Sequence, residues 1–92
     1  MSKFRWLNKQ GVESDSGFVV QFTGRFTAEY RERGRVIVVD VEDGGPSGDK
    51  ANLLYSRESL VAGISPQSER DRVDANFREA LLFQGLIPVF YD

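Results

Sequence analysis

Residues 17–42 constrain the fold more than any other stretch, because apolar residues recur at every second position along three segments that glycines separate. The third segment also carries Val36 and Val38 on its other face, as in a strand in the middle of a sheet or under a covering segment. A period of two is typical of a strand with one buried face. The opposite face of the middle segment is polar, as in a sheet with one face in water. We therefore expect an antiparallel meander. Its inward-facing residues would be Phe18, Val20, Phe22, Phe26, Ala28, Tyr30, Ile37, Val39 and Val41.

The second turn of this meander fixes its register. If Arg33 and Gly34 form the whole turn, Phe26 faces Val41, and the apolar residues of both strands lie on one face. A three-residue loop would instead place Phe26 opposite Asp40. A slip of one residue moves every side chain to the other face. We therefore predict the two-residue turn, although arginine suits its positive φ angles poorly. The other pairs in this register are Tyr30 with Ile37 and Ala28 with Val39.

The first turn of the meander leaves two interpretations open. A two-residue turn of Gly24 and Arg25 would set Phe22 beside Thr27, which mismatches the buried faces. Either the loop is longer, or Gly24 forms a bulge in one long bent strand.

Before the meander, residues 3–8 alternate and predict a first strand with Phe4 and Trp6 on one face. We expect Trp6 in the core, because tryptophan buries a large apolar area. Residues 9–16 are polar and rich in turn-forming residues, and are therefore predicted to be a loop.

Residues 42–52 contain three glycines and a proline and are also predicted to be a loop. Residues 53–55 predict a short fourth strand. Residues 57–64 fit either a helical turn capped by Ser56 or irregular chain.

One long helix is predicted over residues 66–84. Ser65 suits the N-cap and Pro66 the first helical position, while Gly85 suits the position just after the helix. Apolar residues at helical spacing form a narrow stripe. They are Val73, Phe77, Ala80 and Leu81.

Residues 86–91 predict a last strand, and Pro88 places it at an edge because proline has no N–H to donate. The 92 residues thus form a single α+β domain, residues 1–92. We expect a mostly antiparallel sheet of about five or six strands, with the one C-terminal helix packed on one face and a final edge strand.

The sequence contains neither histidine nor cysteine. Histidine is the commonest general base, and the usual zinc sites and Ser/His or Cys/His nucleophiles need one of these residues. We therefore expect a non-catalytic protein without cofactor or metal. A small enzyme that uses carboxylates and tyrosine is the alternative.

The net charge is −2, which does not favour binding to nucleic acid. Four arginines cluster at the turns of the meander, but glutamates lie between them. They are Arg25, Arg31, Arg33 and Arg35. The start of the chain has no apolar region typical of a signal peptide, and no run reaches the ~20 apolar residues of a membrane helix. We expect a cytoplasmic protein that makes no membrane contact.

One carboxylate cluster remains, and it is formed by Asp40, Glu42, Asp43 and Asp49. Carboxylates bind Ca²⁺ or Mg²⁺, but this segment lacks the full EF-hand loop. The other two interpretations are a solvated acidic loop and an acidic loop that binds another protein.

The end of the chain reads R-V-D-A-N-F-R-E-A-L-L-F-Q-G-L-I-P-V-F, a helix that ends at a glycine before a final strand. Together with the upstream G-R-V-I-V-V-D-V-E strand, it resembles small α+β immunity proteins of bacterial polymorphic-toxin and contact-dependent inhibition systems. The positions that carry the resemblance are Arg72, Val73, Asn76, Phe77, Ala80, Leu81, Phe83 and Gly85.

The resemblance implies a partner that neutralises a cognate toxin domain by covering its active site or substrate surface. We predict that the contact surface is the acidic cluster with three arginines at its margins. Its residues are Asp40, Glu42, Asp43, Asp49, Arg31, Arg33 and Arg57. The alternative is a structural or self-associating domain that forms a homodimer through its C-terminal edge strand.

Overall fold

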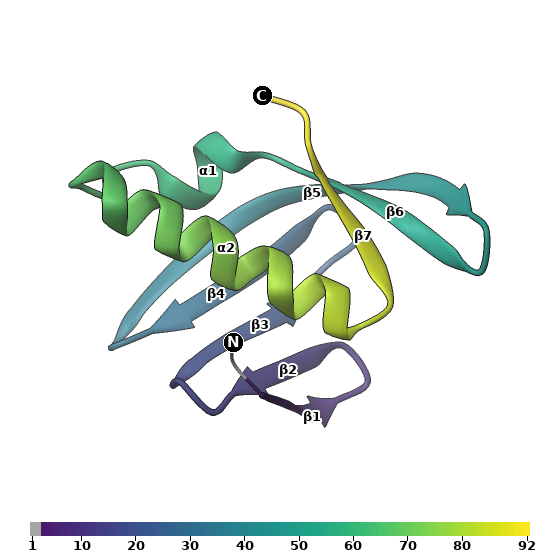
Figure 1. The fold of residues 1–92 in the computed structure, drawn as a ribbon, viewed down its shortest axis with the longest axis horizontal. Coiled ribbons are helices and arrows are strands. Elements are labelled where there is room, and N and C mark those ends of the chain that lie inside the picture. Colours follow the sequence, from purple (N-terminus) through teal and green to yellow (C-terminus); the bar gives the residue numbers. More distant parts are fainter. Residues whose placement is uncertain (1–2) are drawn as a thin grey trace.

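The computed structural model describes residues 3–92 as one curled seven-stranded sheet with a long and a short helix (Figure 1). The strands follow one another in chain order across the sheet. All neighbours are antiparallel except the last pair, which is parallel. The elements are β1 (Phe4–Asn8), β2 (Gly11–Ser14), β3 (Phe18–Phe22), β4 (Thr27–Glu32), β5 (Arg35–Ser47), β6 (Lys50–Tyr55), α1 (Arg57–Val61), α2 (Gln67–Phe83) and β7 (Leu86–Phe90).

The predicted α+β class and the C-terminal helix are confirmed, but the sheet is larger than expected and mixed. Two segments predicted to be loops contain strands. Residues 9–16 include β2, whose Val12 is fully buried in the core. Residues 42–52 form the end of β5, a turn and the start of β6. Pairing with β1 and β3 outweighs the weak local preference of β2, and pairing with β6 does the same for the end of β5.

The register of β4 and β5 is confirmed, with Glu32 opposite Arg35 across a two-residue turn. Arg33 has φ 54° and Gly34 has φ 76°, as this turn requires. The first turn is the longer loop rather than a bulge in one bent strand, since Phe22 pairs with Ala28.

Phe26, which was predicted to face the core, lies in this longer loop and is 57% exposed. Its backbone oxygen accepts a hydrogen bond of 3.0 Å from the N–H of Val41, so only its backbone takes part in the sheet.

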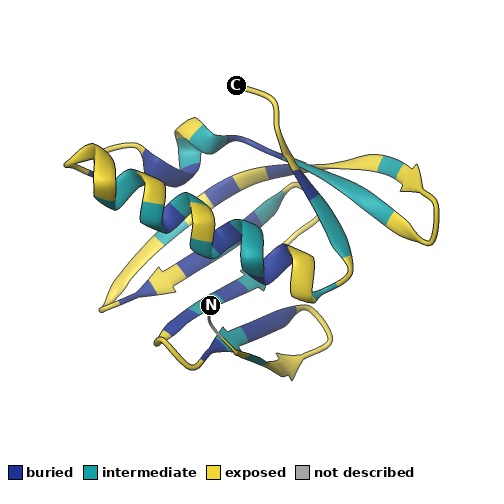
Figure 2. Cartoon of the chain, viewed as in Figure 1, coloured by how far each residue is buried: buried dark blue, intermediate teal, exposed yellow. Residues whose placement is uncertain are grey.

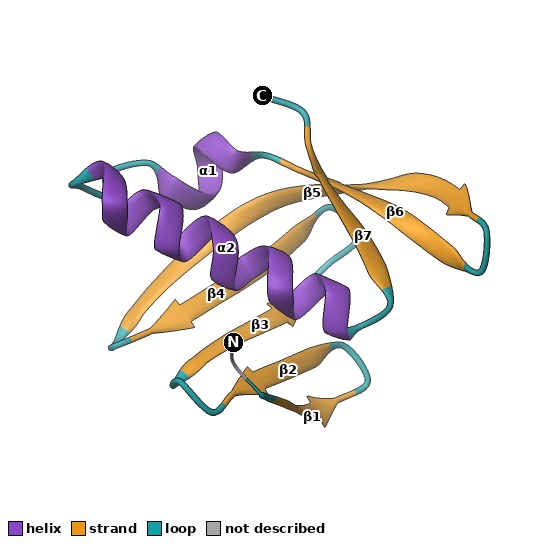
Figure 3. Cartoon of the chain, viewed as in Figure 1, coloured by secondary structure: helices purple, strands orange, loops and turns teal. Residues whose placement is uncertain are grey.

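The hydrophobic core fills the space between the inner face of the sheet and α2 (Figures 2 and 3). Alternate residues of the strands supply one side, and the apolar stripe of α2 supplies the other. From the strands come Val12, Phe18, Val20, Ala28, Tyr30, Val39, Val41 and Tyr55, and from α2 come Val73, Phe77, Ala80 and Leu81.

The two helices begin differently from each other. At α1 the hydroxyl oxygen of Ser56 accepts a 3.0 Å hydrogen bond from the N–H of Ser59, which confirms the helical interpretation of this segment. At α2 the N-cap is Pro66, which has no side-chain cap, so the predicted cap by Ser65 is wrong. The end of α2 is as predicted, with Gly85 at φ 82°.

Strand β7 lies at the edge of the sheet, as Pro88 predicts. The N–H of Tyr91 donates to the carbonyl of Tyr55 at 3.2 Å, so odd-numbered residues of this strand face β6. The backbone nitrogen of Pro88 therefore faces the open edge, where its lack of an N–H costs no hydrogen bond to β6.

Trp6 is not in the core. It lies on the edge strand β1 and is 51% exposed, although it shares the inner face with Phe4. The curl of the sheet carries β1 to the rim of α2, where the indole lies against Phe83 at 5.9 Å between ring centroids.

Candidate functional site

The four predicted carboxylates lie on one projecting arm, which we define as residues 40–50 of β5 and β6. Pairing of β4 with β5 ends at Asp40, and β5 continues for seven more residues. In Figure 1 this arm extends beyond the part of the sheet that α2 covers. A bulge between Asp43 and Pro46 bends the arm. Sequence therefore located the carboxylates on an exposed segment, although the segment is a hairpin.

All four carboxylates are exposed, and none makes an ion pair within the described residues 3–92. Asp43 accepts a 2.8 Å hydrogen bond from the N–H of Gly45, which steadies the bulge. Asp40 and Glu42 share the outer face of β5, whereas Asp49 lies at the tip. Asp40 and Asp49 are thus separated by roughly 20 Å of extended strand. The arm presents a string of separate negative charges.

The predicted arginines do not gather around this arm. Arg57 lies near its base, because the adjoining N–H of Ser56 donates to the Asp40 carbonyl at 2.9 Å. Its guanidinium stacks over the Phe90 ring at 4.0 Å. Arg31 pairs with Glu29 at 3.6 Å on the outer face of β4. Arg33 occupies the turn at the opposite end of β5. The structure thus brings one of the three arginines to the carboxylates.

Charge is unevenly distributed along the chain. Residues 3–39 hold seven cationic and four acidic side chains, whereas residues 40–92 hold five cationic and ten acidic side chains. The arm belongs to the acidic second half of the sequence, so a partner that approaches it meets mainly negative charge.

A second cluster, which sequence reasoning missed, joins β4 to α2. The Arg72 guanidinium donates to both oxygens of Glu32 at 2.9 and 3.0 Å, and also to Glu69. The Tyr30 hydroxyl donates to Glu32 at 2.9 Å and accepts from Asn76. The Arg72 hydrogen bonds lower the pKa of Glu32, and burial raises the pKa of Tyr30 to about 12. Glu32 and Arg72 are forty positions apart, and no local pattern signals their contact.

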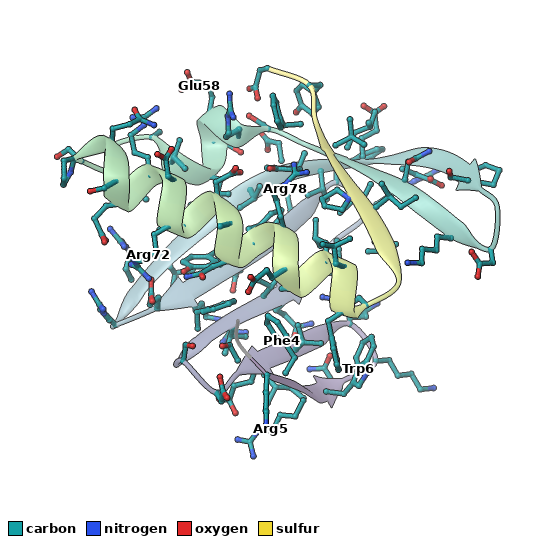
Figure 4. The ribbon with its side chains drawn as sticks, viewed as in Figure 1. Phe4, Arg5, Trp6, Glu58, Arg72 and Arg78 are labelled. Atoms are coloured by element: carbon teal, nitrogen blue, oxygen red, sulfur yellow. The ribbon has the colours of Figure 1, made fainter. Side chains whose placement is uncertain are left out.

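A third cluster lies where α1, α2 and β7 meet. The Tyr55 hydroxyl donates to Asp74 at 2.6 Å and accepts from Arg78 at 3.2 Å. Burial raises the pKa of Tyr55 to about 12. Beside it lies a polar surface pocket of about 230 Å³, whose lining includes Arg57, Arg70 and Asp74. Figure 4 shows Arg78 beneath this junction and Glu58 above it.

Asp92 belongs to the same junction. It accepts hydrogen bonds from the Ser56 hydroxyl and from the N–H of Arg57, both at 2.8 Å, and the Ser56 hydroxyl is the main cause of its lowered pKa. These contacts fasten the last strand to the start of α1.

Within residues 3–92 no three carboxylates lie close enough together to hold a metal ion. Over the same residues, no helix combines the length and apolar character that crossing a bilayer requires. Comparison of the chain with protein-family models, with curated proteins and with solved structures found no match.

Proposed function

We propose that this chain is a non-catalytic binding protein that neutralises a cognate bacterial toxin domain in the cytoplasm. The observation that carries the proposal is the projecting arm with four exposed carboxylates that make no ion pair within the part of the chain that the structure describes. Unpaired charges on an accessible hairpin contribute little to folding, and they remain free to meet charge on a partner.

The surface chemistry suggests the nature of that partner. A toxin domain that acts on nucleic acid needs a basic substrate surface. An acidic hairpin complements such a surface and speeds encounter at low salt. Arg57 at the base of the arm, stacked on Phe90, adds a planar donor that can bind a carboxylate at the rim.

The alternative of self-association through β7 receives less support. A twin strand pairing along that edge would lose a ladder hydrogen bond at Pro88, whose missing N–H faces outward. We therefore rank toxin binding first.

The proposal is tested by co-expression with the toxin domain encoded by an adjacent gene. Wild-type protein should restore growth of cells that express the toxin. The triple variant Glu42→Lys, Asp43→Lys and Asp49→Lys should lose this protection while it accumulates to a normal level. In a matched control variant, Glu58, Asp71 and Glu79 are changed to lysine instead. This control has the same net charge as the arm variant and should still protect. Failure of the wild type to protect, or full protection by the arm variant, contradicts the proposal.

A further inference from the structure

A second exposed surface lies where the edge strand β1 meets the last turn of α2. Its two exposed rings, Trp6 and Phe83, lie 5.9 Å apart between centroids and are 51% and 43% exposed. Small monomeric domains rarely expose several large apolar side chains together, and such patches commonly mark interaction surfaces. We call this surface the aromatic corner.

The aromatic corner is held rigidly by rings that continue into the core. Phe83 contacts Trp6 at 5.9 Å and Phe4 at 5.4 Å between centroids. Phe4 in turn meets Phe18 edge-on at 5.7 Å, and Phe18 is fully buried. Figure 4 shows Phe4 and Trp6 directed toward the end of α2, while Arg5 points away. An aromatic side chain that is already fixed loses little entropy on binding, which favours its use as an anchor.

The backbone beside this corner offers an open sheet edge. The N–H of Asp15 donates to the Lys3 carbonyl at 2.8 Å, so the backbone of Lys3 faces β2. Residues alternate in direction along a strand, and the N–H and C=O groups of Phe4 and Trp6 therefore face outward. Strand β1 ends the order of the described sheet, so these groups are available to an added strand.

Charge at the corner indicates what kind of segment fits. Lys3 and Lys9 flank β1 and make no ion pair in the described chain, and six strand residues span about 20 Å. The nearby carboxylates are engaged, Glu13 by Arg5 and Asp15 by the N–H of Lys3. Residues 3–39 as a whole carry a cationic excess. A bound segment with acidic residues at both ends would therefore complement Lys3 and Lys9.

We infer that the aromatic corner and the free edge of β1 bind an extended segment of another protein, with an apolar centre and acidic residues at both ends. The segment adds as a strand to β1 and rests its apolar side chains on Trp6 and Phe83. This surface lies at the far end of the sheet order from the acidic arm, so it is independent of the toxin-binding proposal.

Two other occupants fit less well. A second copy paired antiparallel about Trp6 would place Lys3 opposite Lys9 of its twin, and like charges across strands repel. Single-stranded nucleic acid would use the aromatic rings, but Arg5 is turned to the other face and paired with Glu13.

The test uses the whole protein and its single tryptophan. The probe is a capped seven-residue peptide with Val and Thr alternating and Asp at both ends. We expect a blue shift of Trp6 emission and changes in the amide NMR signals of β1. The same peptide with Lys at both ends should bind at least about fivefold more weakly at low salt, because Lys3 and Lys9 would repel it.

Two variants test whether binding depends on the Phe83 ring or on any exposed aromatic ring. Phe83→Ala keeps the tryptophan reporter and should weaken binding about 10- to 30-fold. Phe26→Ala removes a more exposed ring elsewhere, 57% against 43% for Phe83, and should leave binding unchanged. Thermal unfolding verifies that both variants are folded.

Several results would overturn the inference. They are an absence of β1 amide changes at about 1 mM peptide, equal binding of both peptides, binding of oligothymidine at the corner, and a concentration-dependent shift of Trp6 emission without peptide. The last would identify a second copy as the occupant.

Discussion

Within residues 3–92, carboxylates are paired in the body of the sheet around β4 but unpaired on the arm, residues 40–50. In the body, Glu32 is buried and bound by Arg72, and Glu29 pairs with Arg31. On the arm, all four carboxylates are exposed, and none is paired within the described chain. The same residue types therefore stabilise the fold in one region and remain available for contact in the other. The partners of a carboxylate, more than its identity, indicate which purpose it serves.

The largest effect should come from the core that the body encloses. Phe77→Ala removes a fully buried ring under Tyr55, and we expect it to lower the free energy of unfolding by about 3–5 kcal/mol. The matched change Phe26→Ala removes an exposed ring and should cost less than about 0.5 kcal/mol. Urea unfolding at pH 7 measures both. Equal losses would show that the described burial is wrong.

The next effect concerns the buried ion pair. Glu32→Gln should lower the free energy of unfolding by about 2 kcal/mol at pH 7, since hydrogen bonds to charged groups are worth about 1.5–3 kcal/mol. Arg72 lowers the pKa of Glu32 in the folded state. The stabilisation by this carboxylate is therefore complete above the ordinary glutamate pKa of about 4.3, and it is lost as the pH falls below that value.

The pH dependence is checked by urea unfolding of wild type and Glu32→Gln at pH 7 and at about pH 3. The difference between the two proteins should shrink at the lower pH. Glu13→Gln, on an exposed pair at the rim, serves as the control and should change stability by less than about 1 kcal/mol. A constant difference for Glu32→Gln across this range would mean that its charge does not contribute.

A smaller effect is expected on the arm. Glu42→Lys, Asp43→Lys and Asp49→Lys together should change the free energy of unfolding by less than about 1 kcal/mol, because these side chains make no ion pair within residues 3–92. The hydrogen bond that is lost, from the N–H of Gly45 to Asp43, lies in an exposed position. The same urea experiment measures it. A loss of several kcal/mol would show that the carboxylates of the arm stabilise the fold, as Glu32 does in the body of the sheet.

The smallest effect lies at the turn between β4 and β5. Arg33 has φ 54°, a conformation that asparagine adopts more readily than arginine. Arg33→Asn should therefore raise the free energy of unfolding by about 0.5 kcal/mol. Thermal unfolding would reveal the gain as a slightly higher midpoint. Arg35→Asn, outside the turn, should give no such gain.

The sequence predicted what depends on local patterns. Alternating residues and one glycine located the β4–β5 register, and Gly85 marked the end of α2. The prediction from sequence failed where pairing with distant strands determines the secondary structure. Strand β2 has one large apolar residue, Val12, and is formed because β1 and β3 pair with it on both sides.

The candidate site was predictable to the same extent. The cluster of Asp40, Glu42, Asp43 and Asp49 is visible in the sequence, and these carboxylates do lie on an exposed arm. The positions of Arg31 and Arg33 relative to this arm depend on how far β5 runs past β4, which no local pattern reveals. The same limit hid the contact between Glu32 and Arg72, and the curl of the sheet that exposes Trp6.

The dissociation constant of the complex with the adjacent-gene toxin domain tests the central claim most directly, when it is measured by calorimetry for wild type and the arm triple variant. We expect the triple variant to bind at least about 100-fold more weakly, with an unfolding free energy close to wild type. Wild-type affinity should also fall as salt rises from about 0.05 to 0.5 M. An unchanged dissociation constant for the folded variant would contradict the assignment of the arm as the contact surface.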